Sequence, residues 1–308
     1  MSHAIEVANL SYRAGPGFQL HDLNLNVPTG SIYGFLGPNG SGKTTTIRLL
    51  LGQLTTGHGA IRVLNEPMPR RAAHVLAGVG YVPERPHLYA MLTVEEAVRY
   101  HASFYKSWDS ALASSLAHSF RLQQGARLSR LSKGEMGKLM MLLALAQKPE
   151  LLILDEPTDG LDPAARREVL SALVDFVAQR TTTVFISSHL VHELERICDL
   201  VAILDNGHLI SEVPIETLKS GMKRLRVSGA PRTIPVTPFK VLERAAESRD
   251  GEVWLVQGWQ TDQLEWFTRS GIDLREVIDL DLEEGFVALM HSRSKQREPA
   301  GSITQLSA

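Results

Sequence analysis

Apolar and polar positions alternate along two segments near the start of the chain, whereas later segments carry apolar runs. Residues 4–12 and 18–27 alternate with a period of two, which is typical of strands with one exposed face. Residues 151–156 and 183–189 carry apolar runs that end in polar clusters, as expected of buried parallel strands. Further strands are predicted at 31–36, 59–64, 79–84 and 200–204. The pattern indicates an α/β fold.

The stretch from about residue 90 to residue 147 has helical character and no clear strand. Thr93 and Glu96 form the pattern of a capping box, in which the side chain of each residue accepts a hydrogen bond from the backbone N–H of the other. Helices are expected at 93–106, 109–122 and 133–147. The sequence therefore predicts a helical subdomain inserted within the α/β frame.

Beyond Pro214 the pattern changes to short elements. Strands are expected at 225–227, 253–256 and 274–278, and helices near 239–247, 262–269 and 282–290. We therefore predict a main domain over residues 1–220, a small α+β accessory domain over 221–291 and a disordered tail over 292–308.

The most specific chemistry follows the strand predicted at 31–36. The chain continues there as Gly37-Pro38-Asn39-Gly40-Ser41-Gly42-Lys43-Thr44 and then as a helical pattern. Glycines let successive backbone N–H groups point inward, and the helix N-terminus adds the positive end of its dipole. Such a loop holds a polyphosphate, with Lys43 at the β- and γ-phosphates and the Thr44 hydroxyl on Mg²⁺.

Two adjacent carboxylates end the strand predicted at 151–156. Asp155 is expected to hold Mg²⁺, directly or through water. Glu156 is the candidate general base, since a carboxylate beside the metal can orient and polarise the attacking water. Ligands of parallel sheets bind at the carboxyl ends of the strands, which is where both residues lie. The two motifs predict a hydrolase that uses ATP and Mg²⁺.

Composition narrows the range of partners. The 308 residues carry 32 basic and 34 acidic side chains, a net charge of -2, so no nucleic-acid partner is expected. The single cysteine, Cys198, excludes an internal disulfide and a cysteine-rich metal site. The N-terminus lacks the pattern of a signal peptide, and the longest apolar stretches are shorter than the roughly 20 residues of a membrane-spanning helix. A membrane role is therefore expected only through a partner.

The motifs together resemble those of the ATP-binding cassette (ABC) ATPases. Five of them occur in the family's order, within about the first two-thirds of the chain: residues 37–44, 131–135, 151–156, 160–162 and 187–189. The resemblance implies a P-loop NTPase cassette, with a RecA-like core, an antiparallel β subdomain and a helical subdomain.

The resemblance also implies that two cassettes face head to tail. Each ATP would lie between the phosphate loop of one cassette and residues 131–135 of the other, which we call the signature segment. Ser132 and Gly134 would contact the γ-phosphate across the dimer, and Asp162 would link the two sites. His189 would contact the γ-phosphate and help to hold Glu156 and its water, beside Lys43.

The remaining implied nucleotide contacts come from the phosphate loop and one upstream aromatic. Tyr12 matches the family's adenine-stacking residue, although a strand aromatic packed in the sheet is the alternative. Together with Ser132, Gly134 and Asp162, the nucleotide contacts implied by the resemblance are Tyr12, Gly37, Pro38, Asn39, Gly40, Ser41, Gly42, Lys43, Thr44 and Thr45.

The sequence departs from the family's pattern at two places. The usual signature is LSGGQ, and here Lys133 and Glu135 replace a glycine and the glutamine. The family often has glutamine after Tyr-Val-Pro, where this chain has Glu84. A glutamate can still offer an oxygen to Mg²⁺, but it adds a negative charge beside a triphosphate. We include Glu84 with Thr44 and Asp155 as the expected metal ligands.

Within the family, residues 81–84 and 131–134 resemble the cassettes of bacterial ABC-2-type exporters of drugs, lipids or polysaccharides. That resemblance implies an ATP-hydrolysing subunit on the cytoplasmic face of the cell membrane, which drives a separate integral-membrane permease and pairs with a second, identical cassette. A strip of apolar residues would receive the permease, unless it packs locally: Pro86, Leu88, Tyr89 and Met91.

Two alternatives stay open. The first is a soluble non-transport ABC ATPase acting on ribosomes or DNA, but neither a second cassette, a coiled coil nor a basic surface is visible in the sequence. The second is a weakly hydrolysing regulatory cassette. Glu156 and His189 argue against it, and Glu84 leaves it open.

Overall fold

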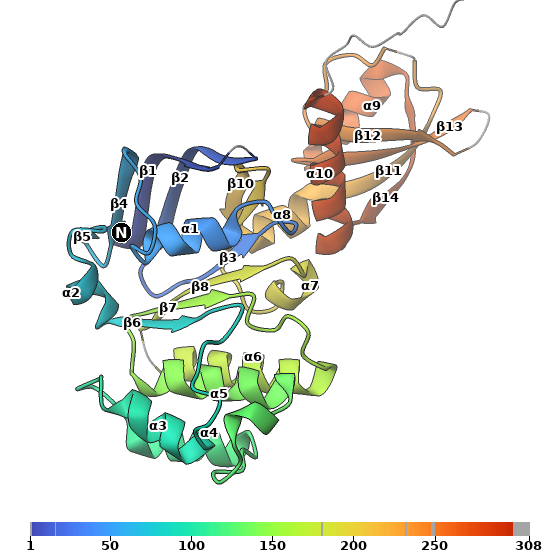
Figure 1. The fold of residues 1–308 in the computed structure, drawn as a ribbon. Helices are drawn as coiled ribbons and strands as arrows, with labels where there is room; N and C mark the ends of the chain where they lie inside the picture. The colour runs from blue at the N-terminus through green and yellow to red at the C-terminus, as the bar shows by residue number, and fades with distance from the viewer. Residues whose placement is uncertain (1, 16, 180, 232, 248–249, 298–308) are drawn as a thin grey trace, which may run out of the picture. The chain divides into compact units, whose positions relative to one another are not determined.

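The computed structural model describes residues 2–15, 17–179, 181–231, 233–247 and 250–297, and the chain divides into two compact units (Figure 1). The first unit comprises the described residues up to Leu190 together with Arg196–Glu212. The second comprises Val191–Glu195 and the described residues from Val213 onward.

An antiparallel sheet opens the first unit. Its strands run in the order β2-β1-β4-β5, with β1 His3–Ala14, β2 Phe18–Pro28, β4 His58–Val63 and β5 Glu66–Pro67. Along β2, Leu20 and then alternate residues from Leu23 onward are buried and join the main core. The period of two in the sequence thus reflects a sheet with one buried face.

A six-stranded sheet forms the centre of the first unit. The order is β10-β9-β3-β8-β7-β6, with β3 Ile32–Leu36, β6 Val79–Val82, β7 Leu151–Asp155, β8 Thr183–Ser188, β9 Leu200–Asp205 and β10 His208–Pro214. Strands β6, β7, β8, β3 and β9 are parallel, so their carboxyl ends meet at one edge.

Helices cover this central sheet. Helix α1, Lys43–Leu50, lies between the two sheets, and α5 and α6 lie on the other side of the six-stranded sheet (Figure 1). The helices of the first unit, apart from α1, are α2 Ala72–Leu76, α3 Val94–Ala102, α4 Ser110–Ser119, α5 Lys133–Ala146 and α6 Pro163–Ala178. In α5 every residue from Leu139 is buried, which explains its lack of a polar face.

The second unit is a four-stranded antiparallel sheet with helices. The strand order is β12-β13-β11-β14, with β11 Met222–Ser228, β12 Lys240–Ala246, β13 Gly251–Gln257 and β14 Asp273–Asp279. Its helices are α7 Val191–Leu194, α8 Ile215–Gly221, α9 Leu264–Ser270 and α10 Leu282–Arg297. A separate aromatic core includes Trp254, Phe239 and Phe267.

Two predicted elements in this unit are wrong. The segment expected as a helix near 239–247 contains strand β12, because pairing with β13 overrides the helical propensity of its Leu, Glu, Arg and Ala residues. The tail predicted as disordered from residue 292 continues α10 as far as Arg297, since its Lys, Gln and Arg residues favour helix even without an apolar face. Residues 298–308 lie outside the described residues.

Within the part of the chain that the structure describes, none of the helices combines the length and the apolar character that crossing a membrane requires.

Candidate functional site

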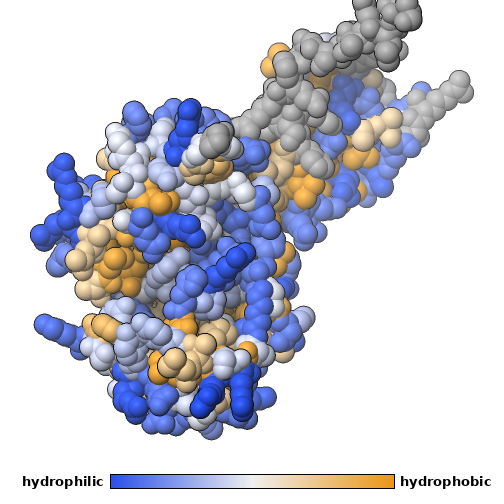
Figure 2. Space-filling model, viewed as in Figure 1, coloured by the Kyte–Doolittle hydropathy of each residue, from blue (hydrophilic) through white to orange (hydrophobic). Residues whose placement is uncertain are grey.

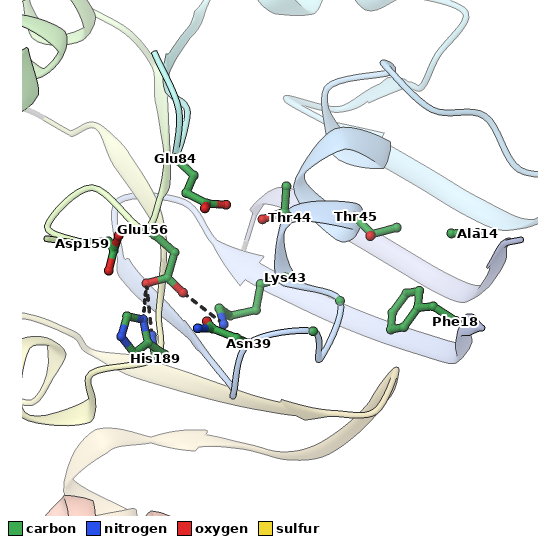
Figure 3. A pocket seen from close by; sticks show the side chains of 12 residues that line it. Ala14, Phe18, Asn39, Lys43, Thr44, Thr45, Glu84, Glu156, Asp159 and His189 are labelled. Carbon is green, nitrogen blue, oxygen red and sulfur yellow. Dashed lines mark hydrogen bonds and ion pairs between the residues drawn. The ribbon is translucent and has the colours of Figure 1, made fainter.

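A cavity of about 570 Å³ opens beside the phosphate loop, where β3, β7 and β8 end (Figure 3). Most of the predicted site residues converge there from separate parts of the sequence. Its lining residues are Ala14, Phe18, Asn39, Gly40, Gly42, Lys43, Thr44, Thr45, Glu84, Glu156, Asp159 and His189.

The loop that borders this cavity needs its glycines for conformation and for space. Gly42 has a φ of 113°, which L-residues rarely adopt, and a Cβ there would lie 2.5 Å from Cζ of Phe18. A Cβ at Gly37 would lie 2.3 Å from the carbonyl oxygen of Leu204. The backbone of the loop therefore packs directly against Phe18 and Leu204, with no room for side chains at Gly42 and Gly37, before α1 begins at Lys43.

Lys43 is buried, and its ammonium group has three oxygen partners. Its Nζ donates to the Gly37 carbonyl at 2.6 Å and to the Pro38 carbonyl at 3.2 Å. It also forms an ion pair with Oε1 of Glu156 at 3.0 Å. The ammonium group of Lys43 thus lies between the carbonyl groups of the phosphate loop and the Glu156 carboxylate, which directly follows β7.

Glu156 is fixed on both of its oxygens. While Oε1 faces Lys43, Oε2 lies 2.8 Å from Nδ1 of His189 and accepts the His189 backbone N–H at 3.2 Å, as Figure 3 shows. The Glu156 N–H donates to Oγ of Ser187 at 3.0 Å. Glu156 has a φ of 50°, a strained conformation that these contacts hold in place. Residues from three segments therefore orient one buried carboxylate.

Asp155 is buried beside the cavity lining and accepts hydrogen bonds from both the phosphate loop and β8. Its Oδ1 accepts from Oγ of Ser187 at 2.8 Å and from Oγ1 of Thr44 at 3.2 Å. Its Oδ2 is buried and has no hydrogen-bond partner. Burial, outweighing the hydrogen bonds, raises the pKa of Asp155 above its usual value.

These oxygens fit a magnesium ion that arrives with a nucleotide. The unpartnered Oδ2 of Asp155, the Thr44 hydroxyl and the half-exposed Glu84 carboxylate are hard oxygen donors. In Figure 3 the Glu84 carboxylate points toward Thr44. Among the described residues no group of three His, Cys, Asp or Glu side chains could hold a metal alone. That is typical of Mg²⁺, which keeps waters and substrate phosphates as ligands.

The structure does not bring Tyr12 to the cavity. Tyr12 is partly buried, pairs with Leu20 across β1 and β2, and packs against the main core, which is the alternative that the sequence left open. Phe18 lines the cavity instead, paired across the turn with Ala14. The sequence pattern does not separate the two aromatic residues, because Phe18 lies two residues before Leu20 and Tyr12 pairs with Leu20, so both share one face of the sheet.

Three further predicted residues lie outside this cavity. Ser132 caps helix α5, and Asp162 caps helix α6 by accepting from the backbone N–H groups of Ala164 and Ala165 at 2.9 and 3.0 Å. Gly134 lies where α5 approaches α6, since a Cβ on it would be 3.2 Å from Cβ of Ala165. The signature segment therefore does not reach the cavity of its own chain.

One contact does connect the signature segment to the cavity wall. Nζ of Lys133 donates to Oδ2 of Asp159 at 3.2 Å, and Asp159 lines the cavity. No sequence motif singles out Asp159, because its contact with Lys133 depends on the approach of α5 to the turn after β7.

Known proteins are similar to this chain in sequence. The model of the ABC transporter family matches residues 20–159. The bacitracin transport ATP-binding protein of Bacillus licheniformis is 37% identical over 221 residues, which cover 71% of this chain and 72% of that protein. The Nod factor export ATP-binding protein I of Rhizobium meliloti (strain 1021) is 38% identical over 214 residues, 68% of this chain and 64% of that protein.

Solved structures share the fold. The ATP-binding subunit of an ABC transporter superposes with a TM-score of 0.64 at 30% identity, over 70% of this chain and 92% of that one. A dimeric bacterial ABC transporter cassette gives 0.62 at 22% identity, over 68% and 98%. The predicted cassette fold is thereby confirmed.

The buried Asp155 gives a testable prediction about stability. Because burial raises its pKa, the folded chain binds this proton more tightly than the unfolded chain does. Stability therefore falls as pH rises through the interval between the ordinary and the raised pKa, and the loss is complete above it. With EDTA and no nucleotide, Asp155→Asn should raise the thermal midpoint at pH 7, and the difference should shrink as the pH approaches 4, roughly the usual aspartate pKa.

Asp162→Asn is the matched control. Backbone hydrogen bonds from Ala165 and Ala164 lower the pKa of Asp162, the opposite direction, and asparagine is also a good helix cap. This variant should not raise the midpoint at any pH. A midpoint for Asp155→Asn at pH 7 equal to or below that of the unaltered chain would contradict the account of Asp155.

Proposed function

Because this chain belongs to the ABC transporter family, we propose that it is the ATP-hydrolysing subunit of an exporter, in which two copies close head to tail on two Mg-ATP and drive a separate membrane permease. The observation that carries the proposal is the convergence of Lys43, Glu156 and His189 on one cavity.

These three residues match the needs of ATP hydrolysis. Lys43 would bind the β- and γ-phosphates as a point charge, after exchanging contacts with the loop carbonyls. Glu156 would orient the attacking water and accept its proton, since the carboxylate lies at the cavity and is held from both sides. His189 would keep Glu156 in position beside the γ-phosphate.

Thr44 and Asp155 would hold Mg²⁺, with Glu84 as a further oxygen donor. The ion supplies neutralisation of the phosphate charge when bound. Asn39, Gly40, Gly42 and Thr45 line the cavity around the phosphates, and the other loop residues, Gly37, Pro38 and Ser41, support them from behind.

A second copy would complete each site. Ser132 and Gly134 lie outside the cavity of their own chain, at the start of a 14-residue helix whose N-terminus favours an anion. Facing another copy, they would contact the γ-phosphate held by that copy. Asp162 lies close to Gly134 and would take part in the link between the sites. The dimeric cassette of similar fold is consistent with this arrangement.

An exposed aromatic patch supports docking to a permease. Tyr89, Met91, Tyr100 and Phe104 are 61%, 77%, 48% and 64% exposed, and the Tyr100 ring contacts those of Tyr89 and Phe104 edge to face. In Figure 2 hydrophobic residues are visible at several places on this face of the first unit, among them the region where Figure 1 draws α3, α4 and α5. Together with the exposed Pro86 and the part-buried Leu88, this patch extends the strip expected from the sequence. Contiguous exposed apolar residues mark interaction sites.

The names of the relatives support the proposed direction of transport, since the Nod factor relative is named for export and the bacitracin relative for transport. As the subunit of an exporter, this chain would act at the cytoplasmic face of the cell membrane, where it would meet its permease. The aromatic patch disfavours the soluble alternative, and the paired Glu156 and His189 disfavour a cassette that scarcely hydrolyses ATP.

Phe18 provides a prediction for nucleotide binding. Its ring lies beside Gly42 on the cavity wall and would stack on adenine, an interaction worth about 1–3 kcal/mol in nucleic-acid cases. Phe18→Ala should therefore weaken ATP binding by about 5- to 100-fold, measured by calorimetry, while tripolyphosphate binding stays unchanged. Phe18→Tyr is the control and should retain ATP binding. Equal ATP affinity in Phe18→Ala and the unaltered chain would exclude this role.

The aromatic patch provides the prediction that tests the transporter function. Tyr100→Ser with Phe104→Ser should abolish recovery of the chain in membranes that contain its permease, because the exposed apolar contact is lost. ATP hydrolysis by the isolated chain should remain, since neither residue lines the cavity. Val236→Ser, at a 94% exposed apolar position in the second unit, is the control. Undiminished membrane recovery of the double variant would refute docking through this patch.

A further inference from the structure

The signature segment contains a carboxylate, that of Glu135, which hydrogen-bonds to Ser132 of the same segment. Oε2 of Glu135 accepts the backbone N–H of Ser132 at 2.8 Å and the Ser132 hydroxyl at 2.8 Å. In return, the Glu135 N–H donates to Oγ of Ser132 at 3.2 Å. The carboxylate thus occupies the donors of Ser132, the residue that faces the second copy in the proposed dimer.

Among the described residues, no Lys or Arg forms an ion pair with the Glu135 carboxylate. Lys133 is paired with Asp159, and Lys138 forms an ion pair with Glu168 at 2.6 Å. Hydrogen bonds from Ser132 lower the pKa of Glu135, so the carboxylate is ionised at neutral pH. A phosphate approaching Ser132 would therefore meet both occupied donors and a like charge.

The carboxylate also has space to move aside. It lines a hollow of about 500 Å³ whose wall carries Arg127 and Arg130. Two guanidinium groups there offer charge-assisted hydrogen bonds to a displaced carboxylate. The contact with Ser132 is therefore exchangeable and not locked by packing.

We propose that Glu135 competes with the γ-phosphate of the ATP bound by a second copy of this chain, and so sets the Mg-ATP concentration at which two copies close. This inference rests on the proposed function, because it needs a closed dimer in which Ser132 faces the other copy's ATP. Glu135 acts as a positioning residue: it holds the Ser132 donors until the phosphate of the second copy takes them and the carboxylate turns toward the arginine side of the hollow.

The test uses the full chain with Glu156→Gln, which slows hydrolysis so that closed dimers persist. The Mg-ATP concentration for half-maximal dimerisation is measured from the solution mass. Adding Glu135→Gln keeps the helix-capping hydrogen bonds but removes the charge, and should lower that concentration about fivefold, the smaller end of couplings between sites. ATP binding by the monomer should not change, because Glu135 does not line the chain's own cavity.

The chain contains a matched control in helix α3. Glu96 forms the same capping box with Thr93, accepting the Thr93 N–H at 2.8 Å and donating its own N–H to Oγ1 at 3.2 Å. Glu96→Gln makes the same chemical change away from the signature segment and should leave the dimerisation midpoint unchanged. Glu135→Ala removes the charge together with the cap, and should also lower the midpoint.

Two sets of outcomes would overturn the proposal, and they can be told apart. An unchanged or raised midpoint with Glu135→Gln, or an equal shift with Glu96→Gln, overturns the competition while leaving closure of two copies intact. A chain carrying Glu156→Gln that binds Mg-ATP and stays monomeric overturns the proposed closure, and the inference about Glu135 with it.

Discussion

The ion pair between Lys43 and Glu156, with His189 on the other carboxylate oxygen, is the interaction around which the site is organised. It joins the phosphate loop, the end of β7 and the end of β8 at one buried point. A buried carboxylate is costly unless it is paired, so the three segments must meet for any of them to be stable in this arrangement. The parallel sheet makes that meeting possible, because the carboxyl ends of β3, β7 and β8 share an edge.

Because the carboxyl ends of the strands share one edge, the residues gathered there make up only one half of each proposed ATP site. The sheet edge carries Glu156, Lys43 and Asp155, the proposed base, phosphate ligand and magnesium ligand, whereas the start of α5, the proposed γ-phosphate contact, lies outside this cavity. Lys133 and Asp159 connect the two surfaces within one chain. In a head-to-tail dimer each chain would contact two ATP molecules, one in its own cavity and one held by the other copy. The contact between Lys133 and Asp159 would lie between these two ATP molecules.

The parts of the fold set by local pattern could be predicted, whereas those set by pairing could not. Glycine spacing and buried strands located the phosphate loop and Glu156, but β12 has the composition of a helix and is a strand only because β13 pairs with it. Phe18 is not a candidate from the sequence, and its place on the cavity wall, where Tyr12 is expected, depends on the three-dimensional structure. The exchange of hydrogen bonds between Ser132 and Glu135 has the spacing of a capping box, yet its position opposite a second copy depends on tertiary structure.

Complementation between two inactive chains tests the composite site most directly. Lys43→Ala disables the loop, and Ser132→Asp keeps a helix cap but adds a negative charge to the signature segment. Each variant alone should be inactive. In an equimolar mixture half of the dimers contain one intact site of two, so about a quarter of the unaltered rate should return. A mixture as inactive as its components would contradict a site shared between two copies.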